Sequence, residues 1–139
     1  MTVAPPRLVV AGAGGDSGKT LVSLGLASAW WQAGFAVSAF KKGPDYIDAA
    51  WLARAAGAPC RNLDTFLMKD EAMASSLAIA ARDAELIMVE GNRGLFDGVD
   101  VEGSHSTAML ARRLAEAGAS VLVADIDEEA AAGTVEQVR

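Results

Sequence analysis

The sequence predicts an α/β fold, in which helices cover both faces of a parallel β-sheet. Short runs of β-branched apolar residues alternate along the chain with longer segments that are apolar at helical spacing. Each short run is apolar at nearly every position, which is typical of strands buried on both faces of a parallel sheet. The chain has 139 residues, 52% of them hydrophobic, which is enough for one domain with its own core. We therefore expect a single domain over residues 1–139.

The first half of the chain predicts two strands and two helices. We expect strands at 7–12 and 36–40, because RLVVAG and AVSAF are short apolar runs. We expect helices at 19–33 and 48–56, because both segments carry apolar residues at helical spacing and a glycine follows each of them.

The second half predicts two more strands and two more helices. A segment rich in alanine and methionine predicts a helix at 70–82, and ELIMVE predicts a strand at 85–90. A helix is expected at 104–117 with a serine at its cap, and SVLVAD predicts a strand at 120–125. The tail as far as Arg139 has a composition that a helix tolerates. Four strands are few for a sheet of this kind, so we expect the chain to be the first part of a larger, incomplete domain.

Charge and cysteine content exclude several classes of protein. The net charge of −6 argues against binding of nucleic acid through a basic surface. The single cysteine excludes an internal disulfide framework and suits a reducing compartment. The N-terminus shows no signal-peptide pattern, and no uncharged run reaches the roughly 18 residues that would span a bilayer. We therefore expect a cytoplasmic protein that binds neither nucleic acid nor membrane.

The segment GAGGDSGKT, between the first expected strand and helix, resembles a phosphate-binding P-loop that is one residue longer than the strict pattern. Glycines let successive backbone N–H groups point toward phosphate oxygens, and the start of the helix adds a positive dipole end. A lysine would reach the β- and γ-phosphates, and a threonine hydroxyl would bind Mg²⁺. The expected ATP-binding residues are Gly12, Gly14, Gly15, Asp16, Ser17, Gly18, Lys19 and Thr20.

Acidic residues follow the expected strands where the ligands of open α/β sheets bind. Glu90 ends ELIMVE, Asp45 and Asp48 follow AVSAF, and Asp97 lies in the loop after Glu90. A P-loop enzyme needs such a carboxylate to hold its metal ion. The structural alternative is a turn for Asp45 and Asp97, and a helix cap for Asp48.

Three motifs behind the extended P-loop, KKGPDYID, RNLDTF and EGNRGLFDGVD, closely resemble those of the cobyrinic acid a,c-diamide synthases. The resemblance covers about 7–125 and places the chain with the dethiobiotin synthetase-like P-loop enzymes. It implies amidation of the a and c acetate groups of cobyrinic acid or a related tetrapyrrole, in cobalamin biosynthesis. The implied reaction uses ATP and Mg²⁺, passes through an acyl phosphate and takes ammonia from glutamine.

The resemblance also implies roles for single residues. Lys19 and Thr20 would hold phosphate and metal, with Asp48 and Glu90 as further metal ligands. Lys41 or Lys42 would meet the transferred phosphate or a substrate carboxylate. The implied catalytic residues are Lys19, Lys41, Asp45 and Asp97, and the implied substrate residues are Tyr46, Asp64, Asn92 and Arg93.

The chain departs from the family pattern in several places. Ala49 and Leu52 stand where the family has proline and histidine, and Arg93 would suit a different anionic substrate. Neither Cys60 nor His105 has the setting of a glutaminase nucleophile, so a glutaminase domain or subunit is an expected partner that this chain lacks. We therefore expect the isolated chain to lack amidation activity. A homodimer is an assembly that the sequence allows. The alternatives are a related P-loop ligase acting on another carboxylate and an ATP-binding module without catalysis.

Overall fold

The computed structural model describes residues 4–116, 118 and 120–124, which form one parallel sheet flanked by helices. The strands of the described part are β1 (Arg7–Gly12), β2 (Val37–Lys42), β3 (Arg61–Leu63), β4 (Leu86–Gly94) and β5 (Ser120–Ala124). Every pairing between them is parallel, and their order across the sheet is β3-β2-β4-β1-β5. The helices are α1 (Lys19–Gln32), α2 (Ile47–Ala56), α3 (Asp70–Ala80) and α4 (Thr107–Glu116).

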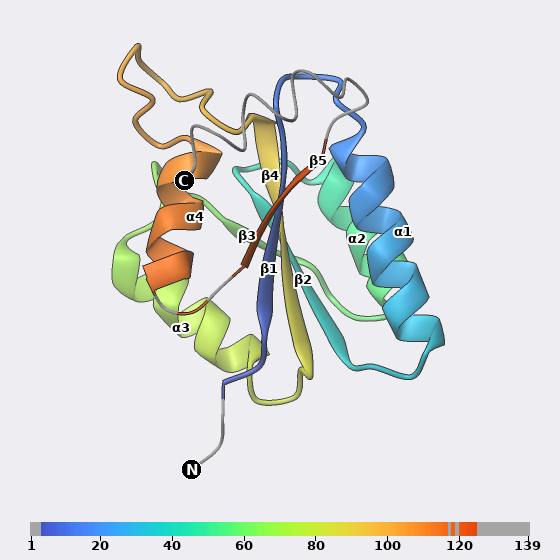
Figure 1. Ribbon diagram of the computed structural model, residues 1–139. Coiled ribbons are helices and arrows are strands. Elements are labelled where there is room, and N and C mark those ends of the chain that lie inside the picture. The colour runs from blue at the N-terminus through green and yellow to red at the C-terminus, as the bar shows by residue number, and fades with distance from the viewer. Residues whose placement is uncertain (1–3, 117, 119, 125–139) are drawn as a thin grey trace.

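The helices form two layers, one on each face of the sheet. Figure 1 shows α1 and α2 together on one face and α3 and α4 on the other. The expected α/β fold with both faces covered is therefore confirmed. Because all the strands run in parallel, their carboxyl ends meet at one edge of the sheet, and the loops that follow β1, β2 and β4 lie there together.

Two separate cores lie on the two faces of the sheet. Val10 and Met88 pack with Leu52 of α2 on one face, whereas Val9 and Phe40 belong to the core under α3 and α4. Neighbouring residues of a strand point to opposite faces, so Val9 and Val10 are both fully buried although they enter different cores. This is why β1 reads as a continuous apolar run.

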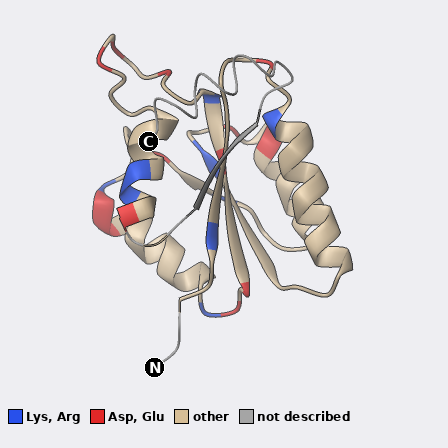
Figure 2. Cartoon of the chain, viewed as in Figure 1, with Lys and Arg blue, Asp and Glu red and all other residues tan. Residues whose placement is uncertain are grey.

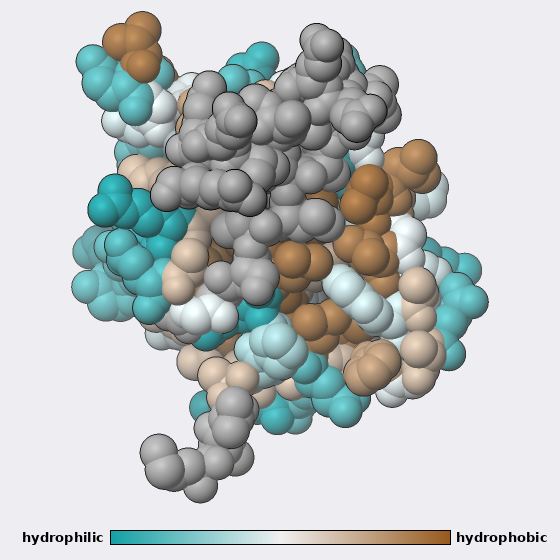
Figure 3. Space-filling view, in the orientation of Figure 1, coloured by the Kyte–Doolittle hydropathy of each residue, from teal (hydrophilic) through white to brown (hydrophobic). Residues whose placement is uncertain are grey.

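The outer side of α1 is also apolar. Leu21 and Val22 are exposed, and Figure 3 shows brown apolar surface over α1 near its beginning. The inner side of the helix contributes Leu24 and Ala27 to the core. The apolar stripe of α1 is therefore broad, and the helix boundaries follow from the glycines at its ends more than from its amphipathic pattern.

The sheet differs from the prediction at β2 and β3. β3, which has only three residues, was not predicted, because RNL is too short and too polar to show the alternation of a strand. β2 continues beyond Phe40 to Lys41 and Lys42, two charged residues that the structure buries. A prediction from hydropathy alone ends the strand at Phe40, because the two lysines that follow are charged.

The start of α4 also differs from the prediction. The helix begins at Thr107, and the expected cap at Ser104 is wrong. Ser106 is the capping residue, because its Oγ accepts a hydrogen bond from the N–H of Met109 at 3.2 Å. Gly103 and His105 have positive φ angles of 74° and 58°, so the chain turns immediately before the helix.

The other predicted elements agree with the structure to within a few residues, except that β4 extends four residues beyond the predicted end, to Gly94. The predicted helical tail over 126–139 lies outside the described residues. In the described part of the chain, no helix has the length and apolar character needed to cross a membrane.

Candidate functional site

The loop between β1 and α1 folds back over the end of its own strand. A Cβ atom on Gly12 would lie 1.8 Å from Ser17 Oγ, so only glycine fits at this position. Asp16 and Gly18 have positive φ angles of 57° and 78°, which turn the chain into the helix. The Oγ atom of Ser17 is buried, and no hydrogen-bond partner for it lies among the described residues. Part of the loop's hydrogen-bonding capacity is thus left for a ligand.

The beginning of α1 has the features of an anion-binding helix end. Gly18 precedes the helix and has no side chain to cap it, and the first turn carries no acidic residue. The N–H groups of the first helical turn have no partner within a helix, and together they form its positive end. A phosphate group is the kind of ligand that such an end binds.

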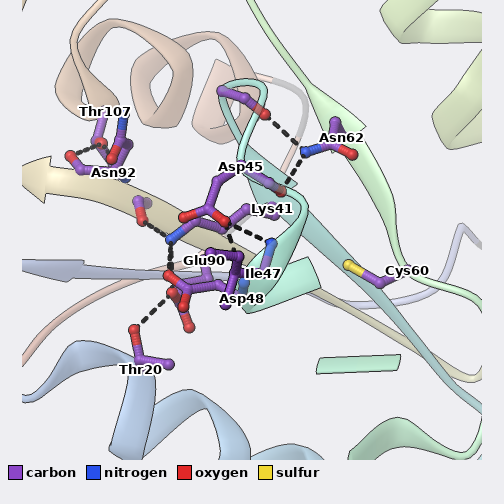
Figure 4. Close-up of polar contacts among 12 residues, drawn as sticks. Thr20, Lys41, Asp45, Ile47, Asp48, Cys60, Asn62, Glu90, Asn92 and Thr107 are labelled. Atoms are coloured by element: carbon purple, nitrogen blue, oxygen red, sulfur yellow. Dashed lines mark hydrogen bonds and ion pairs between the residues drawn. The ribbon is translucent and has the colours of Figure 1, made fainter. Parts of the chain in front are cut away.

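A buried ionic cluster lies next to this helix end, at the carboxyl ends of β2 and β4. Lys41 and Glu90 are 1% and 0% exposed, and Lys41 Nζ lies 2.7 Å from Glu90 Oε1 (Figure 4). The same ammonium group lies 2.9 Å from Asp48 Oδ2 and 3.1 Å from the carbonyl oxygen of Gly91. An ammonium group has three N–H donors, so all those of Lys41 are engaged.

The two oxygens of Glu90 differ in their surroundings. The Thr20 hydroxyl donates to Oε1 at 2.9 Å, and Lys41 donates to the same atom. Oε2 is buried and has no hydrogen-bond partner among the described residues. A buried carboxylate oxygen without a donor is costly, and a cation bound to it would remove that cost.

The residues of this cluster fit a magnesium ion. Thr20, Asp48 and Glu90 offer hydroxyl and carboxylate oxygens, which Mg²⁺ prefers, and Glu90 Oε2 is unsatisfied. Within the described residues, no three histidine, cysteine, aspartate or glutamate side chains converge as a metal site. The protein would therefore supply only part of the coordination. This is usual for Mg²⁺, which keeps water and phosphate oxygens as its other ligands.

The pKa values of Lys41 and Asp48 are both shifted by contacts within the cluster. Burial lowers the pKa of Lys41, but the hydrogen bonds and charges of Glu90 and Asp48 outweigh burial and raise it above its ordinary value. Burial raises the pKa of Asp48, but the hydrogen bond and charge of Lys41 dominate, so that the pKa is lowered. The charge of Lys19 lowers it further, and Figure 2 shows basic and acidic segments close together where α1 and α2 begin.

Asp45, and not Asp48, caps α2. Its Oδ1 accepts hydrogen bonds from the N–H groups of Ile47 at 2.9 Å and Asp48 at 3.0 Å. The alternative interpretation of Asp48 as the capping residue is therefore wrong, and its carboxylate is left to bind Lys41. Asp45 thus fixes the helical turn from which Asp48 points into the cluster (Figure 4).

Asn62 is a positioning residue that the sequence did not reveal. Its Nδ2 donates to the carbonyl oxygens of Gly43 at 2.7 Å and Asp45 at 3.0 Å, and so joins β3 to the loop after β2. The RNLDTF motif was the available signal, but it does not show which of its polar residues binds the neighbouring loop.

In the described part of the chain, the predicted substrate residues make no hydrogen bond to the side chains of the cluster. Tyr46 is 79% exposed, and Asp64 is buried with its Oδ1 accepting the N–H groups of Phe66 and Leu67. Asn92 exchanges hydrogen bonds with Thr107 through its backbone. A further predicted substrate residue, Arg93, is exposed and has a φ angle of 50°.

Asp97 fixes the loop that follows β4. Its Oδ2 accepts the N–H of Gly94 at 2.8 Å, and the N–H of Leu95 donates to the carbonyl oxygen of Gly12 at 2.7 Å. The loop therefore lies against the end of β1, beside the loop that leads into α1. Thr20, Lys41, Asp48 and Glu90 thus form one network, while Asp97 and the substrate residues remain separate predictions.

Cys60 and His105 both have structural surroundings. Burial raises the pKa of the Cys60 thiol to about 12, which disfavours the reactive thiolate. His105 Nδ1 lies 3.1 Å from Thr65 Oγ1, and its ring packs edge-to-face on Phe66. The backbone of Lys41 donates a hydrogen bond to the Cys60 sulfur, which lowers the thiol pKa less than burial raises it.

Comparison with known proteins gives relatives for most of the chain. It is 48% identical over 118 residues to a cobyrinate a,c-diamide synthase of Magnetococcus marinus, an alignment that covers 85% of the chain and 25% of that protein. It is 45% identical over 112 residues to a hydrogenobyrinate a,c-diamide synthase of Streptomyces coelicolor, covering 80% and 23%. A cobyrinate a,c-diamide synthase of Leptospira interrogans is 37% identical over 116 residues, covering 83% and 26%.

These relatives confirm the resemblance that the three motifs predicted. The chain spans about a quarter of the length of the curated relatives it matches. No family model matches the chain.

Proposed function

We propose that this chain, which is related over most of its length to the a,c-diamide synthases, forms the Mg-ATP-binding part of an amide ligase. Its substrate would be cobyrinic acid or a related tetrapyrrole, amidated at the a and c acetate groups in cobalamin biosynthesis. The observation that supports this most is the shared contact of Thr20 and Lys41 with Glu90 Oε1, beside the start of α1. A helix end of the kind that binds phosphate and a carboxylate that suits Mg²⁺ thus lie together.

The proposed reaction activates a carboxylate, which is otherwise a poor electrophile. An oxygen of the substrate carboxylate attacks the γ-phosphorus of ATP, the bond to the bridging oxygen breaks, and ADP leaves. Ammonia then attacks the carbonyl carbon of the acyl phosphate, loses a proton and displaces inorganic phosphate. The ammonia comes from glutamine, hydrolysed by a glutaminase domain or subunit outside this chain.

The loop 12–18 and the start of α1 bind the phosphate groups through backbone N–H groups. Lys19 would meet the phosphate groups as a point charge, while Thr20, Asp48 and Glu90 would hold Mg²⁺. Bound Mg²⁺ supplies charge neutralisation for the phosphate oxygens. Lys41 holds Asp48 and Glu90 in place, because its ammonium group contacts both carboxylates. Positioning and charge neutralisation are the main tasks of a protein in such a reaction.

Asp45 and Asp97 order the two loops around the phosphate position. Asp45 fixes the first turn of α2 and so aims Asp48, whereas Asp97 holds the loop after β4 against Gly94. Each carboxylate accepts these backbone hydrogen bonds through one oxygen. We propose that both carboxylates act on the substrate side of the phosphoryl transfer.

Isothermal titration calorimetry of the purified chain with ATP, with and without Mg²⁺, tests this proposal. We expect binding that depends on Mg²⁺ and that falls at least about tenfold in Glu90→Gln, which keeps the shape but loses the charge. Glu71→Gln, an exposed residue of α3, is the matched control and should bind as the wild type does. Equal ATP binding with and without Mg²⁺, or in Glu90→Gln, would contradict the proposed metal site.

The second measurement concerns the chemistry. ADP formation is followed with Mg-ATP, ammonium chloride and cobyrinic acid, and ADP that forms only when cobyrinic acid is present would support carboxylate activation. An ADP release stimulated equally by unrelated carboxylates would favour a ligase with another substrate. Nucleotide binding without any ADP release, in the presence of a glutaminase partner, would favour a module without catalysis.

A further inference from the structure

Lys41 and Lys42 end the same strand but point to opposite faces of the sheet. Lys41 continues the row of Val37 and Ala39, which pack in the core beneath α1 and α2. Lys42 follows Phe40, a residue of the core beneath α3 and α4. Successive side chains of a strand alternate between its faces, so Lys42 lies on the side away from α1. The KKG sequence thus places one ammonium group on each face of the carboxyl edge.

Lys42 is a buried cation without a direct partner. Its side chain is 7% exposed, and among the described residues no carboxylate lies within ion-pairing distance of its Nζ and no hydrogen bond engages it. The Nζ atom has no hydrogen-bond partner in the described part of the chain, and the protein does not fully enclose it. The ammonium group therefore reaches solvent at the tip of a buried stem.

The surroundings of Lys42 do not supply enough negative charge. Burial lowers its pKa, the charge of Asp64 raises it, and the charge of Lys41 lowers it again, so that the pKa stays below its ordinary value. Asp64 itself uses Oδ1 to accept the N–H groups of Phe66 and Leu67. An additional anion would therefore stabilise the charged form of Lys42.

Lys42 lies at the carboxyl edge of the sheet, next to the turn that follows β3. Lys42 pairs with Leu63 of β3, directly before Asp64, and Gly43 follows it at the carboxyl edge. The contact of Thr65 Oγ1 with His105 Nδ1 joins the turn after β3 to the turn before α4. Both turns thus border the face on which Lys42 lies, whereas Lys41 on the other face is enclosed by Asp48 and Glu90.

We propose that Lys42 binds an anionic oxygen group of the ligand, a carboxylate of the substrate, while Lys41 serves the Mg-ATP site on the opposite face. This inference rests on the proposed function for the identity of the substrate, but not for the existence of the anion site. It divides the two lysines by role: Lys41 positions the metal-binding carboxylates, and Lys42 selects a substrate that carries negative charge next to the reacting group.

The test compares the wild-type chain with Lys42→Met and Lys42→Arg by isothermal titration calorimetry. The titrants are cobyrinic acid, in the presence of Mg²⁺ and a non-hydrolysable ATP analogue, and the analogue alone. Methionine fills the space of the buried stem without charge, and arginine retains the charge. Lys69→Met, which removes an exposed lysine, is the matched control. Thermal unfolding and circular dichroism establish that each variant is folded.

We expect cobyrinic acid to bind about 10- to 100-fold more weakly to Lys42→Met, because a hydrogen bond to a charged group is lost. Lys42→Arg should recover most of this affinity, and the nucleotide analogue should bind equally well to all variants. Wild-type affinity for cobyrinic acid in a folded Lys42→Met variant would overturn the proposal.

A second measurement separates this proposal from the proposed function. The NMR signals of [ε-¹³C]lysine-labelled protein are recorded with cobyrinic acid, citrate and inorganic phosphate, and the signal missing in Lys42→Arg identifies Lys42. A shift of the Lys42 signal with citrate but not with cobyrinic acid would support the carboxylate site and refute the proposed substrate. A shift with phosphate alone would overturn the carboxylate assignment, and no shift with any of them would overturn the anion site.

Discussion

Lys41 and Glu90 form a buried ion pair between neighbouring strands, with Nζ 2.7 Å from Oε1 and both side chains essentially inaccessible to solvent. The two residues are direct partners in the parallel register of β2 and β4, so the sheet itself brings them together. Charges of this kind are costly to remove from water, and the contacts of Asp48, Thr20 and the Gly91 carbonyl offset part of that cost.

Removal of Lys41 should destabilise the fold. Lys41→Met leaves Glu90 buried without its cation, and loss of one partner of a buried pair costs about 3–5 kcal/mol in the free energy of unfolding. Urea unfolding followed by circular dichroism measures this change. The double variant Lys41→Met/Glu90→Met removes both charges and should recover much of the lost stability. A single variant as stable as the wild type would contradict the cost assigned to a Glu90 carboxylate buried without Lys41.

The same substitution should increase affinity for a divalent cation in the absence of nucleotide. The Lys41 ammonium group contacts both carboxylates that are proposed to bind metal, so it competes with a cation there. We expect folded Lys41→Met to bind Mn²⁺, a stand-in for Mg²⁺ that is visible by electron paramagnetic resonance, at least about tenfold more tightly. Lys69→Met should behave as the wild type. Unchanged Mn²⁺ affinity in Lys41→Met would place the cation elsewhere.

The stability of the chain should depend on pH through Asp48 and Lys41. The pKa of Asp48 is lowered from its ordinary value of 3.8, with Lys41 outweighing burial, so its contribution is complete above that value and is lost as the pH falls through the folded pKa. The pKa of Lys41 is raised from 10.5 because Glu90 and Asp48 outweigh burial, so its contribution is complete below that value and is lost as the pH rises through the folded pKa.

We therefore expect the contribution of this pair to be constant between about pH 4 and pH 10 and to decline on both sides. Urea unfolding at a series of pH values measures it. Asp48→Asn should flatten the acid side of the profile, whereas Asp83→Asn, at an exposed position after α3, should leave that side unchanged. An acid limb that is identical in Asp48→Asn and the wild type would contradict the assignment.

Two glycines of the loop before α1 should respond differently to alanine. The Cβ of Gly12→Ala would meet Ser17 Oγ at 1.8 Å, and we expect a loss of about 1–3 kcal/mol as the loop is displaced. A Cβ on Gly14 would meet nothing within 4 Å, so Gly14→Ala should change stability by less than about 0.5 kcal/mol. Thermal unfolding compares the two, and equal effects would mean that the loop adapts around Gly12.

Most of the fold was predictable, because continuous apolar runs and glycine stops carry strong local signals. The parts that were not predictable depend on contacts between distant segments. Lys41 belongs to β2 because Glu90, 49 positions away in sequence, neutralises it on the next strand. Ser106 rather than Ser104 caps α4 because the turn at 103–106 determines where the helix begins.

The candidate site shows the same division between local and distant information. The acids at the strand ends and the loop before α1 were located from sequence, because parallel strands bring their carboxyl ends to one edge. The sequence did not distinguish the roles of Asp45 and Asp48, which depend on which carboxylate turns back to the start of α2. It also left the two adjacent lysines equivalent, and only the strand alternation of β2 separates them.

The strand order has a consequence for the synthesis of the chain on the ribosome. β1 is made first, but its neighbours in the sheet are β4 and β5, and β2 likewise pairs with β4. A nascent chain that has emerged only as far as α3 therefore holds two apolar strands, β1 and β2, that do not pair with each other. Translation of residues 86–94 supplies the strand that β1 and β2 share, so the centre of the sheet forms only after that segment has been made.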